Sequence, residues 1–355
     1  MTRESTDYRG SNNSELTVST GTDPNFLESF FKNSRLSFIG SYKQRNTAAS
    51  SVTKSVSMSH SKKLKGLVFH VDMDSFFASV VLRNFPQYKD RPVAICHYGK
   101  KKDNNRSVVP LEPEVLVPKN SSSECATCNY KAREFGIKKG MFLGRAKQLC
   151  PDLVVLHYDF DGYEEVSEQV LDILHRTASE RNGSVEAVSC DEAYMELMFD
   201  DEDDYLARAG HLAESIRTEI FETTQCTASI GVAANKFLAK LGTDKVKPNG
   251  SFVVRDYQNL LHGLKLRDLH GVGYRTEPKL AAEGLVSVQD IWDLGSNAES
   301  ILCRVLGPGL GKRIFLYSQG KDDRPVKPAE RKTIGAEVST TTMMALLAGK
   351  DKQCV

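Results

Sequence analysis

Residues 70–77 read His-Val-Asp-Met-Asp-Ser-Phe-Phe, and a second acidic segment, residues 189–196, reads Ser-Cys-Asp-Glu-Ala-Tyr-Met-Glu. Apolar residues such as Val68, Val71 and Val185 frame these segments, which predicts that each belongs to a buried strand. Carboxylates at the ends of buried strands repel one another unless a cation lies between them. The two segments therefore predict that distant strand ends meet around a divalent metal ion.

The expected ligands indicate a class of chemistry. Mg²⁺ prefers hard oxygen ligands, keeps some of its waters and takes the rest of its shell from substrate phosphates. Such a site assists phosphoryl or nucleotidyl transfer. The alternative is that these carboxylates are solvated surface groups, as we expect for the acidic run at residues 200–204, which has no apolar frame. The apolar frame of the two segments favours the metal site.

The composition is that of an ordinary globular protein. The chain has 355 residues, 40% hydrophobic and 26% charged, which is enough for two or three domains with hydrophobic cores. A formal net charge of +1 means that any DNA-binding surface must be local. Cys125 and Cys128 form the only close cysteine pair, and we expect reduced thiols rather than a zinc site. Without a signal peptide or a long apolar span, we expect an intracellular protein with no membrane contact.

Composition also divides the chain into segments. We expect residues 1–23 to be disordered, residues 24–43 to form a short N-terminal extension, and residues 44–65 to be a polar linker. The expected strands that follow are 66–71, 92–96, 153–156, 184–188, 193–198 and 227–232. The expected helices are 75–83, 129–136, 163–181, 205–223 and 235–241. This order predicts a split βαβ arrangement, an α+β fold with the helices on one face of the sheet.

Residues 264–319 change character and are expected to be mostly helical. Gly271, Val272 and Gly273 form a Gly-x-Gly turn between two predicted helices. Backbone N–H groups at such a turn bind a phosphate without reading sequence, which predicts a phosphate-binding helix-hairpin-helix. The alternative is an ordinary helical hairpin with a glycine turn.

Four short motifs resemble those of a known family. They are residues 72–77 (Asp-Met-Asp-Ser-Phe-Phe), 129–133 (Asn-Tyr-Lys-Ala-Arg), 189–193 (Ser-Cys-Asp-Glu-Ala) and 247–250 (Lys-Pro-Asn-Gly). In this order they resemble the palm and fingers motifs of the Y-family translesion DNA polymerases. Further strings resemble the deoxycytidyl transferase branch of that family, at residues 30–36, 140–142, 146–151, 186–192 and 322–326.

The resemblance implies a right-hand polymerase with palm, fingers, thumb and little finger. Residues 66–262 would form the palm and fingers, with the fingers at about 85–150, and residues 263–325 would form the thumb. Residues 326–355 begin like the first little-finger strand and then diverge, so we expect a truncated little finger and a divergent tail. The domain through which this branch docks other translesion polymerases would then be absent.

The resemblance also implies roles for the acidic residues. Asp72, Asp191 and the backbone carbonyl of Met73 would hold two Mg²⁺ ions, for which Mn²⁺ is a possible substitute. Glu192 lies beside the site and completes the set of catalytic and metal-binding residues. Two such ions activate a primer 3′-hydroxyl and neutralise the leaving pyrophosphate.

Other residues match the family's nucleotide site. Tyr130, Arg133 and Lys247 would contact the triphosphate, since they offer a hydroxyl, a bidentate fork and a point charge. Phe77 matches the steric gate that excludes a ribose 2′-hydroxyl, although plain core packing is the alternative for a Phe. The remaining expected contacts come from Met73, Asp74, Ser75 and Phe76.

Arg35 carries the most unusual expectation. In this branch an arginine replaces the displaced template guanine, and its N–H donors match the O2 and N3 acceptors of cytosine. Arg35 would therefore select dCTP, and Leu36 would fill the space left by the displaced base. The alternative is a surface arginine near a helix end. The thumb turn at residues 271–273 would hold the DNA backbone.

We therefore expect a nuclear DNA repair enzyme that adds dCMP from dCTP to the primer 3′ end of primer–template DNA in translesion synthesis. A different class of function stays open: a catalytically weak or inactive form that binds DNA or partner proteins without turnover. A nucleotide cyclase is a third possibility, since cyclases share a palm-like sheet and paired metal-binding carboxylates. The thumb hairpin argues against it, because a cyclase does not need to hold a duplex.

Overall fold

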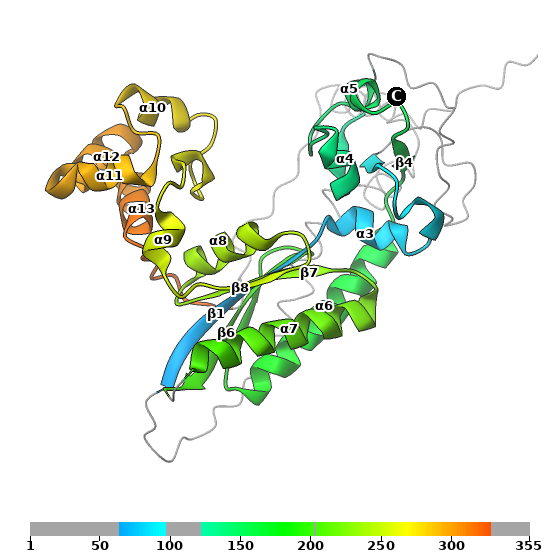
Figure 1. The fold of residues 1–355 in the computed structure, drawn as a ribbon, viewed down its shortest axis with the longest axis horizontal. Helices are drawn as coiled ribbons and strands as arrows, with labels where there is room; N and C mark the ends of the chain where they lie inside the picture. The colour runs from blue at the N-terminus through cyan, green and yellow to red at the C-terminus, as the bar shows by residue number, and fades with distance from the viewer. Residues whose placement is uncertain (1–63, 97–120, 122, 202–203, 328–355) are drawn as a thin grey trace, which may run out of the picture. The chain divides into compact units, whose positions relative to one another are not determined.

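The computed structural model describes residues 64–96, 121, 123–201 and 204–327 (Figure 1). The predictions for residues 1–63, including those for Arg35 and Leu36, lie outside the described residues. So do those for residues 97–120 and for most of the expected little-finger remnant, which follows residue 327. Within the described ranges, no helix combines the length and the apolar character that a bilayer crossing requires.

β1 (Leu64–Met73) is the middle strand of a five-stranded sheet with the order β5-β6-β1-β7-β8. The other strands are β5 (Ser184–Ala187), β6 (Glu192–Asp200), β7 (Ala228–Ala233) and β8 (Ser251–Val253). The helices are α6 (Phe160–Glu180) before β5, α7 (Tyr205–Thr224) between β6 and β7, and α8 (Lys236–Val246) between β7 and β8. β1 pairs antiparallel with both β6 and β7. This is the split βαβ arrangement, so the predicted α+β palm is confirmed.

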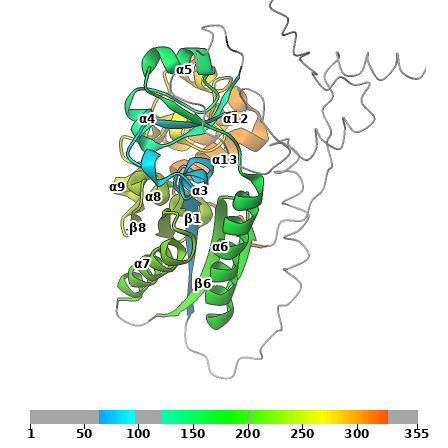
Figure 2. The ribbon, with the colours of Figure 1, turned by 90° about the vertical axis from the view of Figure 1, so that its right-hand side faces the viewer.

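Alternate residues of β1 face opposite sides of the sheet, and helices cover both sides. Val71 lines a small space with Val170 and Leu171 of α6, so this side faces α6 and α7 (Figure 2). α8 covers the other side of the sheet (Figure 1). His70 faces this side, because its ring contacts Thr243 of α8. The prediction that the helices lie on one face only is therefore wrong.

Gly231 of β7 explains how α8 packs so closely on the sheet. A Cβ atom at this position would lie 1.9 Å from the carbonyl oxygen of Ala239 and 2.4 Å from the backbone nitrogen of Thr243. Only glycine leaves room for this close approach, because any side chain would push the helix away. The sequence pattern of a strand does not distinguish this glycine from one that marks a bulge, so the position of α8 could not be predicted from it.

A three-stranded sheet with the order β3-β2-β4 forms the region where the fingers are expected. Its elements are α3 (Phe76–Leu82), η1 (Pro86–Tyr88), β2 (Val93–Cys96), β3 (Cys125–Cys128), α4 (Tyr130–Glu134), α5 (Leu143–Leu149) and β4 (Val154–Leu156). The sequence does not predict β3, because Cys-Ala-Thr-Cys is short and follows a long polar segment. Cys96 and Cys125 lie across this sheet from each other as free thiols, with their Sγ atoms 3.5 Å apart.

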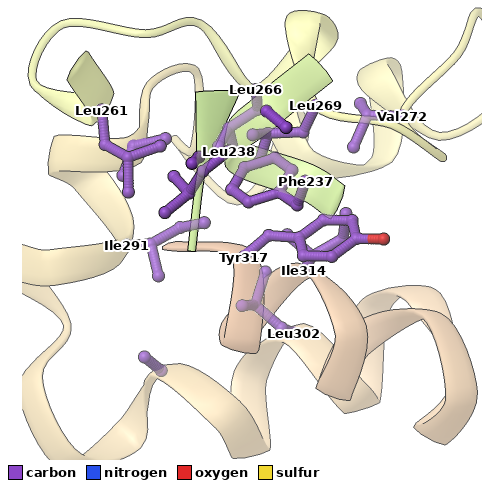
Figure 3. Packing of buried hydrophobic residues seen from close by; sticks show 14 of the residues in the cluster. Phe237, Leu238, Leu261, Leu266, Leu269, Val272, Ile291, Leu302, Ile314 and Tyr317 are labelled. Atoms are coloured by element: carbon purple, nitrogen blue, oxygen red, sulfur yellow. The ribbon is translucent and has the colours of Figure 1, made fainter. Parts of the chain in front are cut away.

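The segment expected to form the thumb is helical. Its elements are α9 (Tyr257–Leu261), η2 (Leu266–Asp268), α10 (Glu277–Ala282), α11 (Val288–Asp293), η3 (Gly295–Asn297), α12 (Ala298–Leu306) and α13 (Pro308–Ser318). Phe237 of α8 belongs to the same buried cluster as Leu302 and Ile314 (Figure 3). The rings of Phe237 and Tyr317 stack with their centroids 4.2 Å apart. The hydrophobic core of these helices is therefore continuous with that of the five-stranded sheet.

The chain returns to the five-stranded sheet after α13. Ser184 of β5 donates its hydroxyl to the carbonyl oxygen of Val326 over 3.0 Å. Asn235 donates an amide N–H to the carbonyl oxygen of Gly320 over 2.8 Å. The first residues of the expected little-finger remnant are thus held against the edge of the sheet.

Candidate active site

The two acidic segments meet at the end of β1. Asp72 of β1 and Glu192 of β6 are direct partners in the antiparallel register. One position further, the N–H of Met73 donates to the carbonyl oxygen of Asp191 over 2.9 Å. The Ser189 hydroxyl donates to Oδ1 of Asp191 over 2.6 Å. β-Sheet pairing therefore brings together carboxylates that are far apart in the sequence, as the two acidic segments predict.

These carboxylates form a candidate cation site with a neighbouring histidine. His70, Asp72 and Glu192 each offer a ligand atom, and these atoms all lie within 4.8 Å of one another. Among the described residues, Asp191 does not belong to this group, but its negative charge acts on the carboxyl of Asp72. Clustered carboxylate oxygens are suitable ligands for a hard divalent cation.

The pKa of Asp72 also indicates that this group of residues suits a bound cation. Burial raises the pKa of Asp72 above its ordinary value, and the charge of Asp191 raises it further. The ammonium of Lys247, 2.6 Å from Oδ1 of Asp72, acts in the opposite direction. The charge of Lys247 alone therefore does not cancel the rise in the pKa of Asp72 that burial and Asp191 cause. A divalent cation between the carboxylates would favour their ionised forms. The donor set fits a bound metal ion.

Glu192 has a different environment from Asp72. Its Oε1 accepts hydrogen bonds from Nε2 of His70 over 2.8 Å and from Nζ of Lys240 over 2.7 Å. Burial acts to raise the pKa of Glu192, but the hydrogen bond from His70 and the charge of Lys240 outweigh it and lower the pKa to about 2. Burial also holds the pKa of His70 below its ordinary value. Glu192 is therefore ionised across the physiological range.

This lowered pKa predicts a pH-dependent contribution to stability. Because folding lowers the pKa of Glu192 from 4.5 to about 2, its stabilisation is complete above pH 4.5 and is lost as the pH falls toward 2. The free-energy difference in unfolding between the wild type and Glu192→Gln should shrink by up to about 3 kcal/mol over that range. Urea denaturation without divalent cations measures it, and Glu222→Gln, on the exposed side of α7, is the control. A difference that does not change with pH would contradict the prediction.

Tyr130 and Arg133 both belong to α4, with Tyr130 as its first residue and Arg133 in its last turn. The guanidinium of Arg133 lies 4.3 Å from the centroid of the Tyr130 ring. Burial raises the pKa of Tyr130 to about 12, and the negative charges of Asp74 and Asp72 act in the same direction. Tyr130 is therefore within electrostatic reach of the carboxylates. A cation and a phenol donor are suitable groups for a phosphate oxygen at this place.

The residues after Asp72 hold the loop that follows β1. Asp74 is 2% exposed, and its carboxylate accepts hydrogen bonds from the Ser229 hydroxyl and the Asn249 N–H, each over 2.8 Å. Ser75 has a φ of 44° and begins α3, so the chain turns sharply after the acidic segment. These contacts show a supporting role for Asp74, which ties β1 to the Lys-Pro-Asn-Gly motif.

The two phenylalanines differ in exposure. Phe76 is 3% exposed and belongs to the core. Phe77 is only partly buried, and its ring centroid lies 4.5 Å from that of Tyr163 in α6. An aromatic neighbour of this kind fixes the ring of Phe77 in one place. The steric-gate role of Phe77 stays a prediction, as does a direct nucleotide contact by Ser75 or Phe76.

The Gly-x-Gly turn lies between η2 and α10. Gly271 adopts a φ of 101°, which favours glycine, and Val272 is buried. The N–H of Val272 donates to the carbonyl oxygen of Leu269, and the N–H of Gly273 donates to the Thr276 hydroxyl over 2.8 Å. These two N–H groups already have partners inside the thumb, so binding a phosphate through them would require an exchange of bonds. The DNA contact of this turn stays a prediction.

Three residues of the site, His70, Lys240 and Thr243, are not predicted from the sequence. One signal was available for His70, which lies two positions before Asp72 and must share its face of a strand. A histidine in an otherwise apolar run needs a buried polar partner. No comparable signal exists for Lys240 and Thr243, because their proximity depends on how α8 docks.

Comparisons with known proteins agree with this geometry. Residues 71–244 match the model of the impB/mucB/samB family. "DNA polymerase IV" of Shewanella amazonensis is 36% identical over 276 residues, which cover 77% of this chain and 69% of that protein. "DNA repair protein Rev1" of Drosophila melanogaster is 34% identical over 385 residues, which cover 94% of this chain and 37% of that protein.

Solved structures of DNA polymerases are also similar to this chain. The "Insertion ternary complex of Dbh DNA polymerase" superposes with a TM-score of 0.61 at 30% sequence identity, covering 73% of this chain and 69% of that one. The chain spans between 27 and 37% of the length of the Rev1 proteins that it matches. Its fold, its paired acidic segments and these similarities agree: the chain belongs to the impB/mucB/samB family of Y-family DNA polymerases.

Proposed function

We propose that the protein is a DNA-directed nucleotidyltransferase that adds dCMP from dCTP to a primer 3′ end in translesion synthesis, in the nucleus. The observation that carries the proposal is the convergence of Asp72, Asp191 and Glu192 at the ends of β1 and β6. The similarity to Rev1 proteins over 94% of the chain supports the deoxycytidyl transferase branch. Primer–template DNA and dCTP are the proposed substrates.

The proposed mechanism assigns two Mg²⁺ ions to Asp72, Asp191 and the carbonyl of Met73, with Glu192 beside them and Mn²⁺ as a possible substitute. When bound, such ions favour ionisation of the primer 3′-hydroxyl and neutralise charge on the leaving pyrophosphate. Lys247 pairs with Asp72 in the structure. When a nucleotide binds, the ammonium of Lys247 can exchange this partner for a triphosphate oxygen. Arg133 and Tyr130 orient the same triphosphate, and Phe77 excludes a ribose 2′-hydroxyl.

Arg35 and Leu36 complete the proposal from outside the described residues. The guanidinium of Arg35 would donate to the cytosine edge, and Leu36 would occupy the place of the displaced template base. The thumb turn at residues 271–273 would contact the DNA backbone. A pair of directed hydrogen bonds of this kind discriminates between bases by about 1–3 kcal/mol.

Substituting Arg35 tests the selection of dCTP. In single-nucleotide insertion with each of the four dNTPs, Arg35→Ala should reduce the preference for dCTP by about 10- to 100-fold, as expected for the loss of a bidentate contact. Lys32→Ala removes a cationic side chain three positions earlier in the sequence and should leave the preference unchanged. A preference for dCTP that survives Arg35→Ala would overturn the assignment.

The same assay tests the alternative of a protein that binds without turnover. That alternative predicts no added nucleotide by the wild type at saturating Mg²⁺, together with retained binding to primer–template DNA. The similarity of the chain to DNA polymerases over most of its length argues against the cyclase alternative, which shares only the sheet and the paired carboxylates.

A further inference from the structure

His70 is a polar residue in the middle of the five-stranded sheet, and the chemistry proposed above does not use it. Its exposed fraction is 0%, and both of its ring nitrogens have partners. Nδ1 lies 2.8 Å from the Thr243 hydroxyl, and Nε2 lies 2.8 Å from Oε1 of Glu192. A buried imidazole with two directed contacts has a fixed orientation.

The partner of each nitrogen assigns its role. An ionised carboxylate only accepts hydrogen bonds, so Nε2 of His70 carries the proton and donates it to Glu192. The Thr243 hydroxyl has one proton and three acceptors within reach: Nδ1 of His70 at 2.8 Å and the carbonyl oxygens of His70 at 3.0 Å and Ala239 at 3.1 Å. Donation to Nδ1, the shortest of the three contacts, is the one that a neutral ring protonated at Nε2 requires. Thr243 in α8 thus selects the tautomer that donates to Glu192, as hydrogen-bonded partners of metal-site histidines commonly do.

Only one of the two carboxylate oxygens of Glu192 has hydrogen-bond partners among the described residues. Its Oε1 accepts from both His70 and Lys240, whereas its Oε2 accepts no hydrogen bond within the described part of the chain. Oε2 is therefore the oxygen available to a cation that Asp72 also binds. Because the nitrogens of His70 are already engaged, His70 is better placed to orient Glu192 than to bind the cation itself.

The position of Thr243 depends on the close packing of α8. Gly231 is the β7 partner of His70 in the sheet register. A Cβ atom on Gly231 would lie 2.7 Å from Oγ1 of Thr243. Oγ1 of Thr243 therefore lies against both the ring and the backbone of His70, 2.8 Å from Nδ1 and 3.0 Å from the carbonyl oxygen. The close packing of α8 on β7 at Gly231 thus places Thr243 next to His70, the residue that contacts Glu192.

We propose that His70, oriented by Thr243, is a positioning residue that holds Glu192 in the geometry required for binding the catalytic divalent cation. The inference rests on the proposed function. Partners that orient a metal ligand typically contribute 10- to 100-fold to metal affinity. Loss of the His70 donor should therefore weaken cation binding without removing a ligand.

Mn²⁺ binding measures this contribution without turnover. Electron paramagnetic resonance of free Mn²⁺, titrated against the full chain without DNA or nucleotide, should show about 10-fold weaker binding or more for His70→Ala. Thr243→Val should weaken binding in the same direction but less, because it removes only the hydroxyl. His70→Gln, which can keep an N–H donor near Glu192, should restore part of the affinity. Thr177→Val is the matched control, since the Thr177 hydroxyl donates to a helix carbonyl in α6.

A second readout separates positioning from general damage. In primer extension, His70→Ala should raise the Mg²⁺ concentration needed for half-maximal rate, and the rate should recover at saturating Mg²⁺. If His70→Ala does not fold, Thr243→Val decides the question by the same two measurements. If His70→Ala folds and binds Mn²⁺ with wild-type affinity, the inference is overturned. If only Thr243→Val folds, wild-type Mn²⁺ affinity in that variant overturns it. Mn²⁺ binding by a wild type that adds no nucleotide would instead overturn the proposed function and leave the inference standing.

Discussion

Asp72→Asn is expected to reduce nucleotide addition by about 10³-fold or more, which corresponds to about 4 kcal/mol of transition-state stabilisation. Asp72 is the carboxylate that meets Glu192 in the sheet register and pairs with Lys247. Asparagine keeps the shape of the side chain but removes the charge that attracts a divalent cation. Primer extension with dCTP and Mg²⁺ measures the loss.

The stability of the same variant separates chemistry from folding. Because burial raises the pKa of Asp72, the ionised carboxylate is unfavourable in the folded protein at neutral pH, and asparagine removes that unfavourable term. We therefore expect Asp72→Asn to unfold at the same urea concentration as the wild type or at a higher one. Asp172→Asn, on the exposed side of α6, is the control for activity. Substantial activity in a folded Asp72→Asn would refute the metal-site assignment.

Phe237→Ala is expected to lower the free energy of unfolding by about 3–5 kcal/mol, the usual effect of deleting a buried aromatic ring. Phe237 is 4% exposed and stacks on Tyr317, so the substitution leaves a cavity where α8 meets α13. Urea denaturation followed by far-ultraviolet circular dichroism measures the loss. Phe221→Ala is the control, because Phe221 is 42% exposed.

The continuous core also predicts one cooperative transition. Trp292 is the only tryptophan of the chain, and its Nε1–H donates to the carbonyl oxygen of Ser318 over 2.7 Å. Its fluorescence therefore reports on the thumb helices, whereas circular dichroism reports on all helices and strands. The two signals should change at the same urea concentration in the wild type. Separate transitions would show that the thumb unfolds independently of the sheet.

The sequence predicts the elements that carry clear patterns. Buried strands framed by valine locate β1, β5 and β6, and the acidic residues at the end of β1 and the start of β6 locate the candidate cation site. The motif at residues 129–133 predicts a helix there, and the structure has Tyr130 and Arg133 in α4. These features depend on local periodicity, which a single sequence displays directly.

The sequence does not predict features that depend on packing between distant elements. His70 resembles any polar residue in a strand until α8 supplies Thr243 as its partner. Asp74 matches a nucleotide-site motif, yet its carboxylate binds Ser229 and Asn249, which no pattern in the sequence indicates. The pairing of Lys247 with Asp72 likewise follows only from the docking of α8.

The contacts of His70 also have a consequence for synthesis of the protein. They join residues separated by 122 positions on one side and 173 positions on the other. Contacts of such long range form late, because closing a long chain segment must precede them. While the ribosome is still translating α8, the nascent chain already contains Asp72, Asp191 and Glu192 but lacks Thr243, the partner of His70. The contacts that hold His70 and Glu192 can therefore be complete only after α8 has left the exit tunnel.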